Sequence, residues 1–290
     1  MTSLRYEAPE TVEDAVRLLA DADGEARPLA GGTDLLVQLR TDMVRPGLIV
    51  DLKRIPALME VAANGAEIRV GAAVSGAALG KSEAVKAAWP GVVEALELIG
   101  STQIQGRASL GGNLCNGSPA ADSVPALIAA GAVCKIAGPG GTRSLPVEDV
   151  VTGPGQLSLG PGEIVVSFVM PKPPARSGDA YLRFIPRTEM DIAVVGAGVA
   201  LTLDEAGICT HARLSLGAVA PRPLLVEAGA EALIGTRVDD DALANLAAAA
   251  SAACDPIDDK RGTIEYRVKV AGVLARRAAL IALERARSNG

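Results

Sequence analysis

Two glycine pairs are the residues of this sequence whose types and spacing best suit ligand chemistry. One lies in Pro28-Leu-Ala-Gly-Gly-Thr-Asp-Leu35, here called the first glycine loop, and the other in Arg107-Ala-Ser-Leu-Gly-Gly-Asn113, the second glycine loop. Glycine lets the backbone turn tightly and approach a ligand closely, and Thr33 can cap the helix expected after the first loop. A glycine turn that opens a helix presents free N–H groups to an anion. Two such loops can hold the two charged groups of a diphosphate.

The same residues also have plainer explanations, which stay open at this point. The chain contains 32 glycines, so either pair can form an ordinary turn, and neither matches the G-x-G-x-x-G or G-x-x-x-x-G-K-[ST] spacing. His211, the only histidine, lies in a strand-like alternation and is expected to be exposed rather than catalytic. Cys115 is either a thiol activated near a helix start or a small buried residue. Asp122, nine residues beyond the second loop, either caps a helix or contacts the ligand.

Short sequence signals predict the elements that must position these loops. Thr11 opens a capping box for a first helix. Pro90 interrupts a long helical pattern, so a helix must begin or bend there. Asn64 and Gly65 favour a hairpin turn in which both residues have positive φ. We expect helices at 12–20, 35–41, 84–99, 123–130, 242–253 and 263–287, a hairpin at 59–70, and strands at 48–52, 132–137, 163–170, 192–203 and 210–219.

A change of composition marks the expected boundary between two domains. The segment Pro171-Lys-Pro-Pro-Ala-Arg-Ser-Gly178 has three prolines in four positions, which neither a central strand nor a helix interior accepts. The expected domains are therefore 1–174 and 179–290. The element order is mixed, with a larger N-terminal unit followed by a smaller unit of strands and then helices, which predicts the α+β class.

Composition excludes several classes of function. The 290 residues are 49% hydrophobic but only 2% aromatic, and 28 basic residues face 34 acidic ones, so nucleic acid is not an expected partner. One histidine and four scattered cysteines without a C-x-x-C pair predict no metal site, and redox chemistry would need an organic cofactor. The sparse cysteines, a start without the apolar region of a signal peptide and the lack of a bilayer-spanning stretch favour the cytoplasm.

The glycine loops and their surroundings resemble one family of proteins. Ala30–Leu36, and Ser109–Cys115 continuing into Ser118–Asp122, are similar to the two FAD diphosphate loops of the FAD-binding medium subunit of the molybdenum hydroxylases, the carbon monoxide dehydrogenase and xanthine dehydrogenase group. The resemblance covers nearly the whole chain in the same order. It continues through Glu163–Val166, Tyr181–Phe184, Arg187 with Asp191–Ala193, and Leu216–Pro223.

This resemblance implies a fold, a cofactor and its contacts. The fold would be α+β, an FAD-binding domain of the vanillyl-alcohol-oxidase/PCMH type followed by a smaller α+β C-terminal domain of the CO dehydrogenase flavoprotein type. Ser109 stands where threonine is common, and Arg183 where lysine is common, which keeps the hydroxyl and the charge respectively. The implied contacts to a non-covalently bound FAD are Pro28, Leu29, Ala30, Gly31, Gly32, Thr33, Asp34, Leu35, Ile99, Ser109, Leu110, Gly111, Gly112, Asn113, Asp122, Val166 and Arg183.

The resemblance also implies an oxidoreductase subunit with no catalytic side chain of its own. A large molybdopterin-binding subunit would oxidise the substrate, a small subunit would hold two [2Fe–2S] clusters, and this chain would pass electrons through FAD to an external acceptor, in a dimer of heterotrimers. Carbon monoxide, purines, N-heterocycles and aldehydes are all compatible substrates, and NAD, a quinone or another carrier is a compatible acceptor. The alternatives are a self-contained FAD-dependent oxidase or reductase on the same fold, or a binding protein without flavin.

Overall fold

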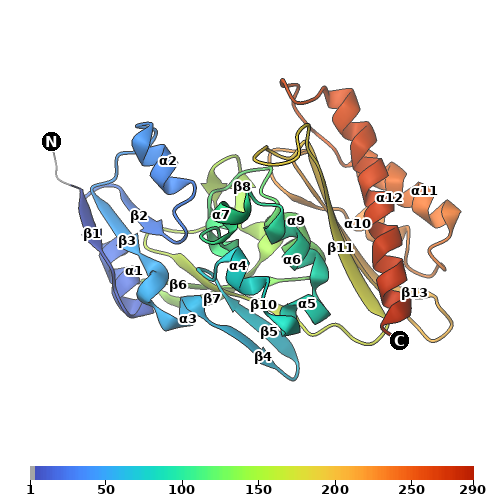
Figure 1. Ribbon diagram of the computed structural model, residues 1–290, viewed down its shortest axis with the longest axis horizontal. Coiled ribbons are helices and arrows are strands. Elements are labelled where there is room, and N and C mark those ends of the chain that lie inside the picture. Colours follow the sequence, from blue (N-terminus) through green and yellow to red (C-terminus); the bar gives the residue numbers. More distant parts are fainter. Residues whose placement is uncertain (1–3) are drawn as a thin grey trace.

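The first glycine loop leaves the end of a strand in a small parallel sheet. In the computed structural model, which describes residues 4–290, β3 lies at the centre of this sheet, between the two other strands. The strands are β1 (Arg5–Glu7), β3 (Leu48–Asp51) and β2 (Ala26–Leu29). Because β2 ends at Leu29, the chain enters the glycines at the carboxyl edge of the sheet (Figure 1).

Helix α1 (Val12–Ala20) covers this sheet and begins where the sequence predicts. The side chain of Thr11 accepts a hydrogen bond from the N–H of Asp14 at 3.1 Å, which satisfies one of the donors left free at a helix start. Ala15 and Val16 are buried against Leu48 and Val50 of β3 in one hydrophobic cluster. The helix therefore fixes the sheet from which the first loop emerges.

A five-stranded antiparallel sheet carries the other walls of the N-terminal unit. Its order is β4 (Val61–Asn64), β5 (Glu67–Gly71), β10 (Ile164–Pro171), β6 (Val133–Gly138) and β7 (Gly141–Pro146). The predicted hairpin β4–β5 is confirmed, but the expected positive φ at Asn64 and Gly65 is wrong. Asn64 pairs with Glu67 and its side-chain oxygen accepts the N–H of Glu67 at 3.3 Å, so this side chain closes the turn.

Short helices and one small hairpin complete the N-terminal unit. Pro90 starts a new helix, as the sequence predicts, since its missing N–H is tolerated in the first turn. The elements are α2 (Leu35–Arg40), α3 (Pro56–Met59), α4 (Gly76–Leu79), α5 (Glu83–Ala88), α6 (Pro90–Glu97), α7 (Thr102–Gln105), α8 (Leu110–Cys115), α9 (Ser123–Ala129), β8 (Val151–Gly153) and β9 (Gln156–Leu157).

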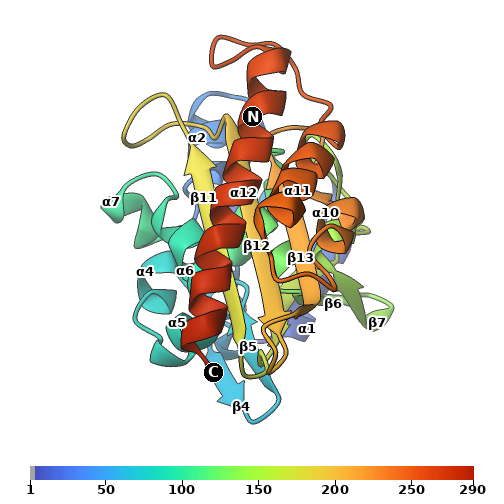
Figure 2. The same cartoon turned by 90° about the vertical axis from the view of Figure 1, so that its right-hand side faces the viewer.

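The C-terminal unit is a four-stranded antiparallel sheet with helices on its outer face (Figure 2). Its elements are β11 (Ser177–Phe184), β12 (Val195–Leu203), β13 (Cys209–Gly217), β14 (Leu224–Leu225), α10 (Glu227–Glu231), α11 (Asp240–Ala252) and α12 (Ile264–Ser288). Every element expected from the sequence is present, with ends shifted by at most three residues. His211 is exposed on β13, as predicted. Among residues 4–290, no helix combines the length and the apolar character needed to cross a membrane.

The inner face of this sheet packs directly on helices of the N-terminal unit, chiefly α6 and α9 (Figure 1). An added Cβ on Gly198 of β12 would lie 2.6 Å from the carbonyl oxygen of Pro125 in α9. Glycine at this position therefore allows strand and helix to approach closely. The two units share an extended contact surface.

Asp179 of β11 makes a polar contact in this surface that is unusually buried. Its carboxylate accepts the N–H of Gly91 at 2.9 Å, in the first turn of α6, whose own N-cap residue provides no side-chain acceptor. Arg285 of α12 hydrogen-bonds the Asp179 carbonyl at 2.7 Å and forms an ion pair with Glu94 of α6. Burial raises the pKa of Asp179 to about 7, against the lowering effect of Arg285.

The raised pKa of Asp179 predicts a pH dependence of folding stability. The folded chain holds this proton more tightly than the unfolded chain, so the favourable contribution is present at low pH and is lost as pH rises toward 7. Relative to the Asp179→Asn variant, the wild type should lose about 2 kcal/mol of unfolding free energy between about pH 5 and pH 8. Urea unfolding at several pH values measures this difference. Asp23→Asn, at an exposed site, is the control, and equal slopes for wild type and Asp179→Asn would contradict the assignment.

Candidate functional site

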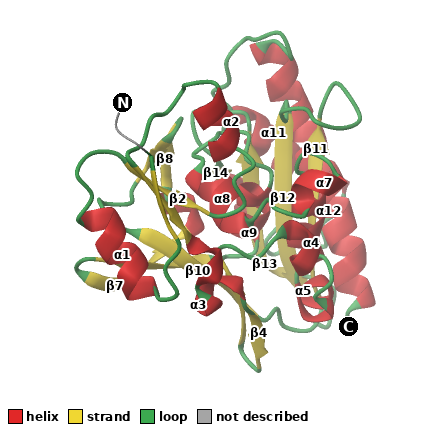
Figure 3. Cartoon of the chain, turned by 60° about the vertical axis from the view of Figure 1, so that its left-hand side comes forward, coloured by secondary structure: helices red, strands yellow, loops and turns green. Residues whose placement is uncertain are grey.

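A cavity of about 800 Å³ lies where the two glycine loops meet. The whole of the first glycine loop lines it, together with Ser109, Gly111, Gly112 and Asn113 of the second. The segment 160–165, which leads into β10, also contributes to the lining, and so does Ile99. In Figure 3, α2, which follows the first loop, and α8, which begins within the second loop at Leu110, lie near each other above β10. The fold thus brings together residues that the sequence separates widely.

The two loops touch through their backbones. A Cβ on Gly31 would lie 1.9 Å from the carbonyl oxygen of Arg107, a distance that no side chain accepts. Gly32 has a φ of +81°, in the left-handed region that favours glycine. The two glycines therefore have separate roles, because Gly31 permits the contact between loops and Gly32 permits the turn.

The first glycine loop leaves five consecutive backbone donors free, those of residues 31–35, within the described residues 4–290. The N–H groups of Gly31, Gly32 and Thr33 have no hydrogen-bond acceptor within residues 4–290. The prediction that Thr33 caps α2 is wrong, because Asp34 occupies the N-cap position and makes no side-chain capping bond. Free N–H groups beside a cavity are suited to oxygen atoms of an anionic ligand.

The second glycine loop uses the backbone donors of its glycine pair and of Asn113 inside the protein. The N–H of Gly111 bonds to the carbonyl of Ala72 at 2.9 Å, and that of Gly112 bonds to the Ser109 hydroxyl oxygen at 3.2 Å. The N–H of Asn113 bonds to the Ser109 carbonyl at 2.9 Å. The expectation that each loop offers its backbone to one phosphate group is therefore compatible with the free donors of the first loop, whereas these three donors of the second loop are already used. The second loop therefore contributes to the cavity mainly by packing against it, through Ser109, the two glycines and Asn113.

Polar side chains connect the two loops at the start of α2 and the end of α8. Asn116 donates its side-chain N–H to a carboxylate oxygen of Asp34 at 3.3 Å, and Gln38 donates to the amide oxygen of Asn116 at 3.2 Å. Burial raises the pKa of Asp34 above its usual value. These bonds hold the first turn of α2 against the segment after α8.

Asp122 and Arg183, both expected to contact the ligand, contact each other instead of lining the cavity. Their ion pair joins α9 to β11 at 2.9 Å, and the Tyr181 hydroxyl donates to the other Asp122 oxygen at 2.9 Å. Burial raises the pKa of Asp122 to about 6, although Arg183 and Tyr181 oppose this effect. The Asp122 side chain does not cap α9. Only Nη1 of Arg183 has a partner in the described chain, which leaves its other donors available.

The remaining expected residues differ in their access to the cavity. Leu110, within the second loop, is fully buried and does not line the cavity. Val166 of β10 follows the cavity-lining residue Val165 in the chain but does not line the cavity itself. Val166 accepts the Ala72 N–H through its carbonyl at 2.9 Å. Cys115 lines the cavity and is half-buried, and burial raises the pKa of its thiol to about 12, which is the opposite of the shift that activates a thiol.

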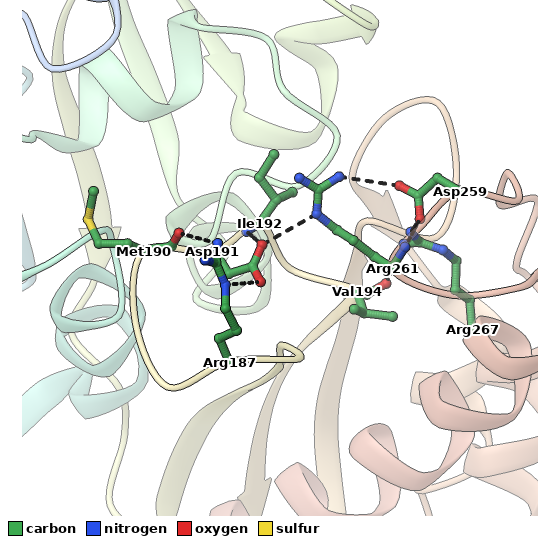
Figure 4. Close-up of polar contacts among 8 residues, drawn as sticks. All are labelled: Arg187, Met190, Asp191, Ile192, Val194, Asp259, Arg261 and Arg267. Carbon is green, nitrogen blue, oxygen red and sulfur yellow. Dashed lines mark hydrogen bonds and ion pairs between the residues drawn. The ribbon is translucent and has the colours of Figure 1, made fainter.

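A loop between β11 and β12 is fixed by charged residues of the C-terminal unit (Figure 4). Asp191 accepts hydrogen bonds from Arg187 at 3.1 Å and from Arg261 at 3.4 Å. The N–H of Met190 reaches the carbonyl of Gly100 at 3.4 Å, so the loop lies against the chain just after Ile99. The Arg187 and Asp191 motif of the sequence thus shapes the loop beside one end of the cavity.

Two family models match this chain, one over each of its two units. The family described as the FAD binding domain in molybdopterin dehydrogenase matches residues 2–173, and the CO dehydrogenase flavoprotein C-terminal domain matches residues 180–282. The chain belongs to the FAD-binding family of the molybdopterin dehydrogenases. It is therefore an oxidoreductase subunit, and the predicted family, α+β fold class and FAD cofactor are confirmed.

Individual relatives extend over most of the chain. It is 36% identical to the carbon monoxide dehydrogenase medium chain of Afipia carboxidovorans, over 99% of both proteins. It is 35% identical to a putative xanthine dehydrogenase FAD-binding subunit of Escherichia coli, over 76% of this chain and 75% of that protein. A solved structure of reconstituted CO dehydrogenase from Oligotropha carboxidovorans superposes with a TM-score of 0.93 at 36% identity, covering 98% of both chains.

The residues of the cavity fit FAD as a cofactor. A volume of about 800 Å³ is within the range of sites for small molecules and cofactors. The free N–H groups of Gly31, Gly32 and Thr33 suit the anionic oxygens of a diphosphate. The site therefore offers both room for the cofactor and donors for its charged part.

Several residues that shape the site carry no clear signal in the sequence. Lys53 and Arg107 hydrogen-bond to carbonyls of the first glycine loop, and Tyr181 bonds to Asp122. Each of these contacts joins segments that are far apart in the chain. The lining stretch 160–165 contains two glycines and a proline. These residues can mark a place where the backbone approaches another group closely, but they do not indicate which group that is.

The contact between Gly31 and Arg107 predicts that Gly31→Ala weakens FAD binding by about a hundredfold or more. The added methyl group overlaps the Arg107 carbonyl, so the loop must shift and carry its N–H donors away from the cofactor. Fluorescence titration of the apoprotein with FAD measures the effect, and circular dichroism verifies the fold. Gly65→Ala is the control, because its Cβ meets open space at ordinary φ. An affinity of Gly31→Ala within threefold of wild type would refute this role.

Proposed function

We propose that the chain binds one FAD in the cavity between the glycine loops and relays electrons within a molybdenum hydroxylase. The observation that carries the proposal is the row of free N–H groups at Gly31, Gly32 and Thr33, in residues that line a cavity of sufficient size in a chain of this family. When bound, FAD accepts electrons and releases them to a further carrier. The protein's own residues bind, orient and enclose it.

The proposed contacts are divided among three regions. The first glycine loop, from Pro28 to Leu35, holds the diphosphate with its backbone, while Ser109 to Asn113 packs behind it and adds the Ser109 hydroxyl and the Asn113 amide. Ile99 provides an apolar wall, and Val166 supports the wall from β10. Asp122 and Arg183 are proposed as contacts at the junction of the two units, which the unused donors of Arg183 support.

The proposed partners are a large molybdopterin-binding subunit and a small [2Fe–2S] subunit, assembled as a dimer of heterotrimers. Relatives of the chain are named as a medium chain and as subunits of dehydrogenases, one of them a dehydrogenase complex, which supports a multi-subunit enzyme. Electrons would reach the flavin from the iron–sulfur subunit and leave to an external acceptor. The substrate would then be oxidised on the large subunit, and this chain would need no acid or base for that step.

The proposed domains are 1–174 for FAD binding and 179–290 for the C-terminal unit, with the cytoplasm as the compartment. A hydrophobic cluster confined to the N-terminal unit, another confined to the C-terminal unit, and the proline-rich segment between β10 and β11 support the division. The four cysteines are all unpaired, as expected in a reducing compartment.

The relay proposal predicts that substrate reduces the flavin only when the partner subunits are present. Stopped-flow absorbance at about 450 nm follows reduction of the FAD-loaded chain, alone and after addition of both partners, with carbon monoxide, N-heterocycles, purines and aldehydes. Reduction should be at least about a hundredfold faster with the partners and one of these substrates, because the substrate site is on another subunit. Dithionite should reduce the isolated chain in either case, which serves as the control. Rapid reduction of the isolated chain by any substrate would instead favour a self-contained oxidase.

A further inference from the structure

Two successive carbonyl groups of the first glycine loop accept hydrogen bonds from cationic side chains outside it. Lys53 Nζ donates to the carbonyl of Ala30 at 2.9 Å, and Arg107 Nε donates to the carbonyl of Gly31 at 3.3 Å. Most backbone carbonyls in proteins bond to other backbone groups. Here the loop is held instead by side chains that reach it from after β3 and from the second glycine loop.

Because the peptide bond is planar, these contacts also fix the direction in which the free N–H groups point. In a trans peptide, the carbonyl of one residue and the N–H of the next point in opposite directions. The carbonyl of Ala30 points to Lys53, so the N–H of Gly31 points away from Lys53. In the same way, the carbonyl of Gly31 points to Arg107 and the N–H of Gly32 points away from it. These two N–H groups are among the donors that have no acceptor in the described chain.

Lys53 is itself fixed by a buried carboxylate. Asp51 accepts hydrogen bonds from Lys53 Nζ at 2.7 Å and from the Lys53 N–H at 3.0 Å, while Tyr6 donates to its other oxygen. Burial would raise the pKa of Asp51, but the bonds from Lys53 and Tyr6 hold it below the usual value. The charge of Lys53 is therefore offset, and what Lys53 contributes to the loop is geometry.

Arg107 contributes in a different way. Its side chain lies at the surface, forms no ion pair with any described carboxylate, and makes the single hydrogen bond to Gly31. Its positive charge is therefore available to the field around the first loop, in addition to its hold on the carbonyl. Lys53 and Arg107 therefore differ in whether the positive charge is paired within the protein, and this difference can be tested.

We propose that Lys53 and Arg107 are positioning residues for the cofactor diphosphate, which turn the N–H groups of Gly31 and Gly32 toward it. The proposal rests on the proposed function, because it requires that FAD binds at the first glycine loop. Lys53 acts by fixing the Ala30 carbonyl. Arg107 acts by fixing the Gly31 carbonyl and by adding unpaired positive charge close to the diphosphate.

Titration calorimetry of the apoprotein with FAD and with ADP, at two salt concentrations, tests the proposal. ADP carries the diphosphate without the flavin ring, so an effect shared by both ligands locates the change at the diphosphate. The variants are Lys53→Met, Arg107→Gln and Arg107→Lys. Lys81→Met, at an exposed site, and Arg237→Gln, which removes an exposed arginine from the Ala206 carbonyl in the C-terminal unit, are the matched controls.

Lys53→Met should weaken both ligands about tenfold, because the Ala30 carbonyl loses its donor and the Asp51 carboxylate is left without its cationic partner. Arg107→Gln should weaken both ligands by a similar factor and also flatten the salt dependence. Arg107→Lys keeps the charge but loses the Nε donor, so it should restore the salt dependence and only part of the affinity. The controls should bind like wild type, and melting temperatures verify that each variant is folded.

Affinities of Lys53→Met and Arg107→Gln within twofold of wild type, with wild type binding FAD and ADP tightly, would overturn the positioning role and leave the proposed function intact. Weakened FAD binding with unchanged ADP binding would also overturn it, since the effect would then lie away from the diphosphate. Failure of the wild-type apoprotein to bind either ligand would contradict the proposed function itself, and the positioning role with it.

Discussion

The close approach of Gly31 to the carbonyl of Arg107 is the constraint on which the rest of the site depends. One methyl group at Gly31 would occupy the space in which the two loops meet. One loop leaves a parallel sheet at the end of β2, and the other leads into α8 beside the antiparallel sheet. Contact between them therefore joins the two sheets of the N-terminal unit and forms the wall of the cavity. A side chain at this point would separate the loops and widen the site.

The two loops use their backbone N–H and carbonyl groups in different ways. In the second loop, the N–H groups of Gly111, Gly112 and Asn113 bond to Ala72 and Ser109, so this part of the loop acts as a support. The first loop has its carbonyls bonded by cations and its N–H groups free, an arrangement that costs stability in the absence of an anion and favours binding of one. The same chain thus builds a support and a binding surface from two similar glycine motifs.

The C-terminal unit is oriented on this site by charged contacts as well as by packing. Three ion pairs cross between the units, each joining an acid of the N-terminal unit to an arginine of the C-terminal unit: Asp122–Arg183, Glu148–Arg213 and Glu94–Arg285. Partly buried pairs of this kind add little net stability but penalise other arrangements strongly, because a displaced partner leaves a charge uncompensated. They therefore specify how the sheet of β11 to β14 sits on α6 and α9.

Local signals in the sequence predict most of the helices and strands. They do not predict contacts between segments that are distant in the chain. Thr11 and Pro90 act on their own helices, so their effects can be read from neighbouring residues. The turn at Asn64 differs from the expectation because a side-chain hydrogen bond closes it without the positive φ that the residue pair favours. The family resemblance supplies Asp122 and Arg183 as site candidates, but only the tertiary fold pairs them. Nothing near Lys53 in the chain indicates that it holds the carbonyl of Ala30.

The most direct test of the account follows individual backbone amides as a diphosphate binds. In nuclear magnetic resonance spectra of ¹⁵N-labelled apoprotein titrated with ADP, the Gly31, Gly32 and Thr33 amides should shift strongly, since they gain an acceptor. The Gly111 and Gly112 amides should shift much less, because they keep their acceptors within the protein. Strong shifts at Gly111 and Gly112 with little change at Gly31 and Gly32 would contradict the division of roles between the two loops.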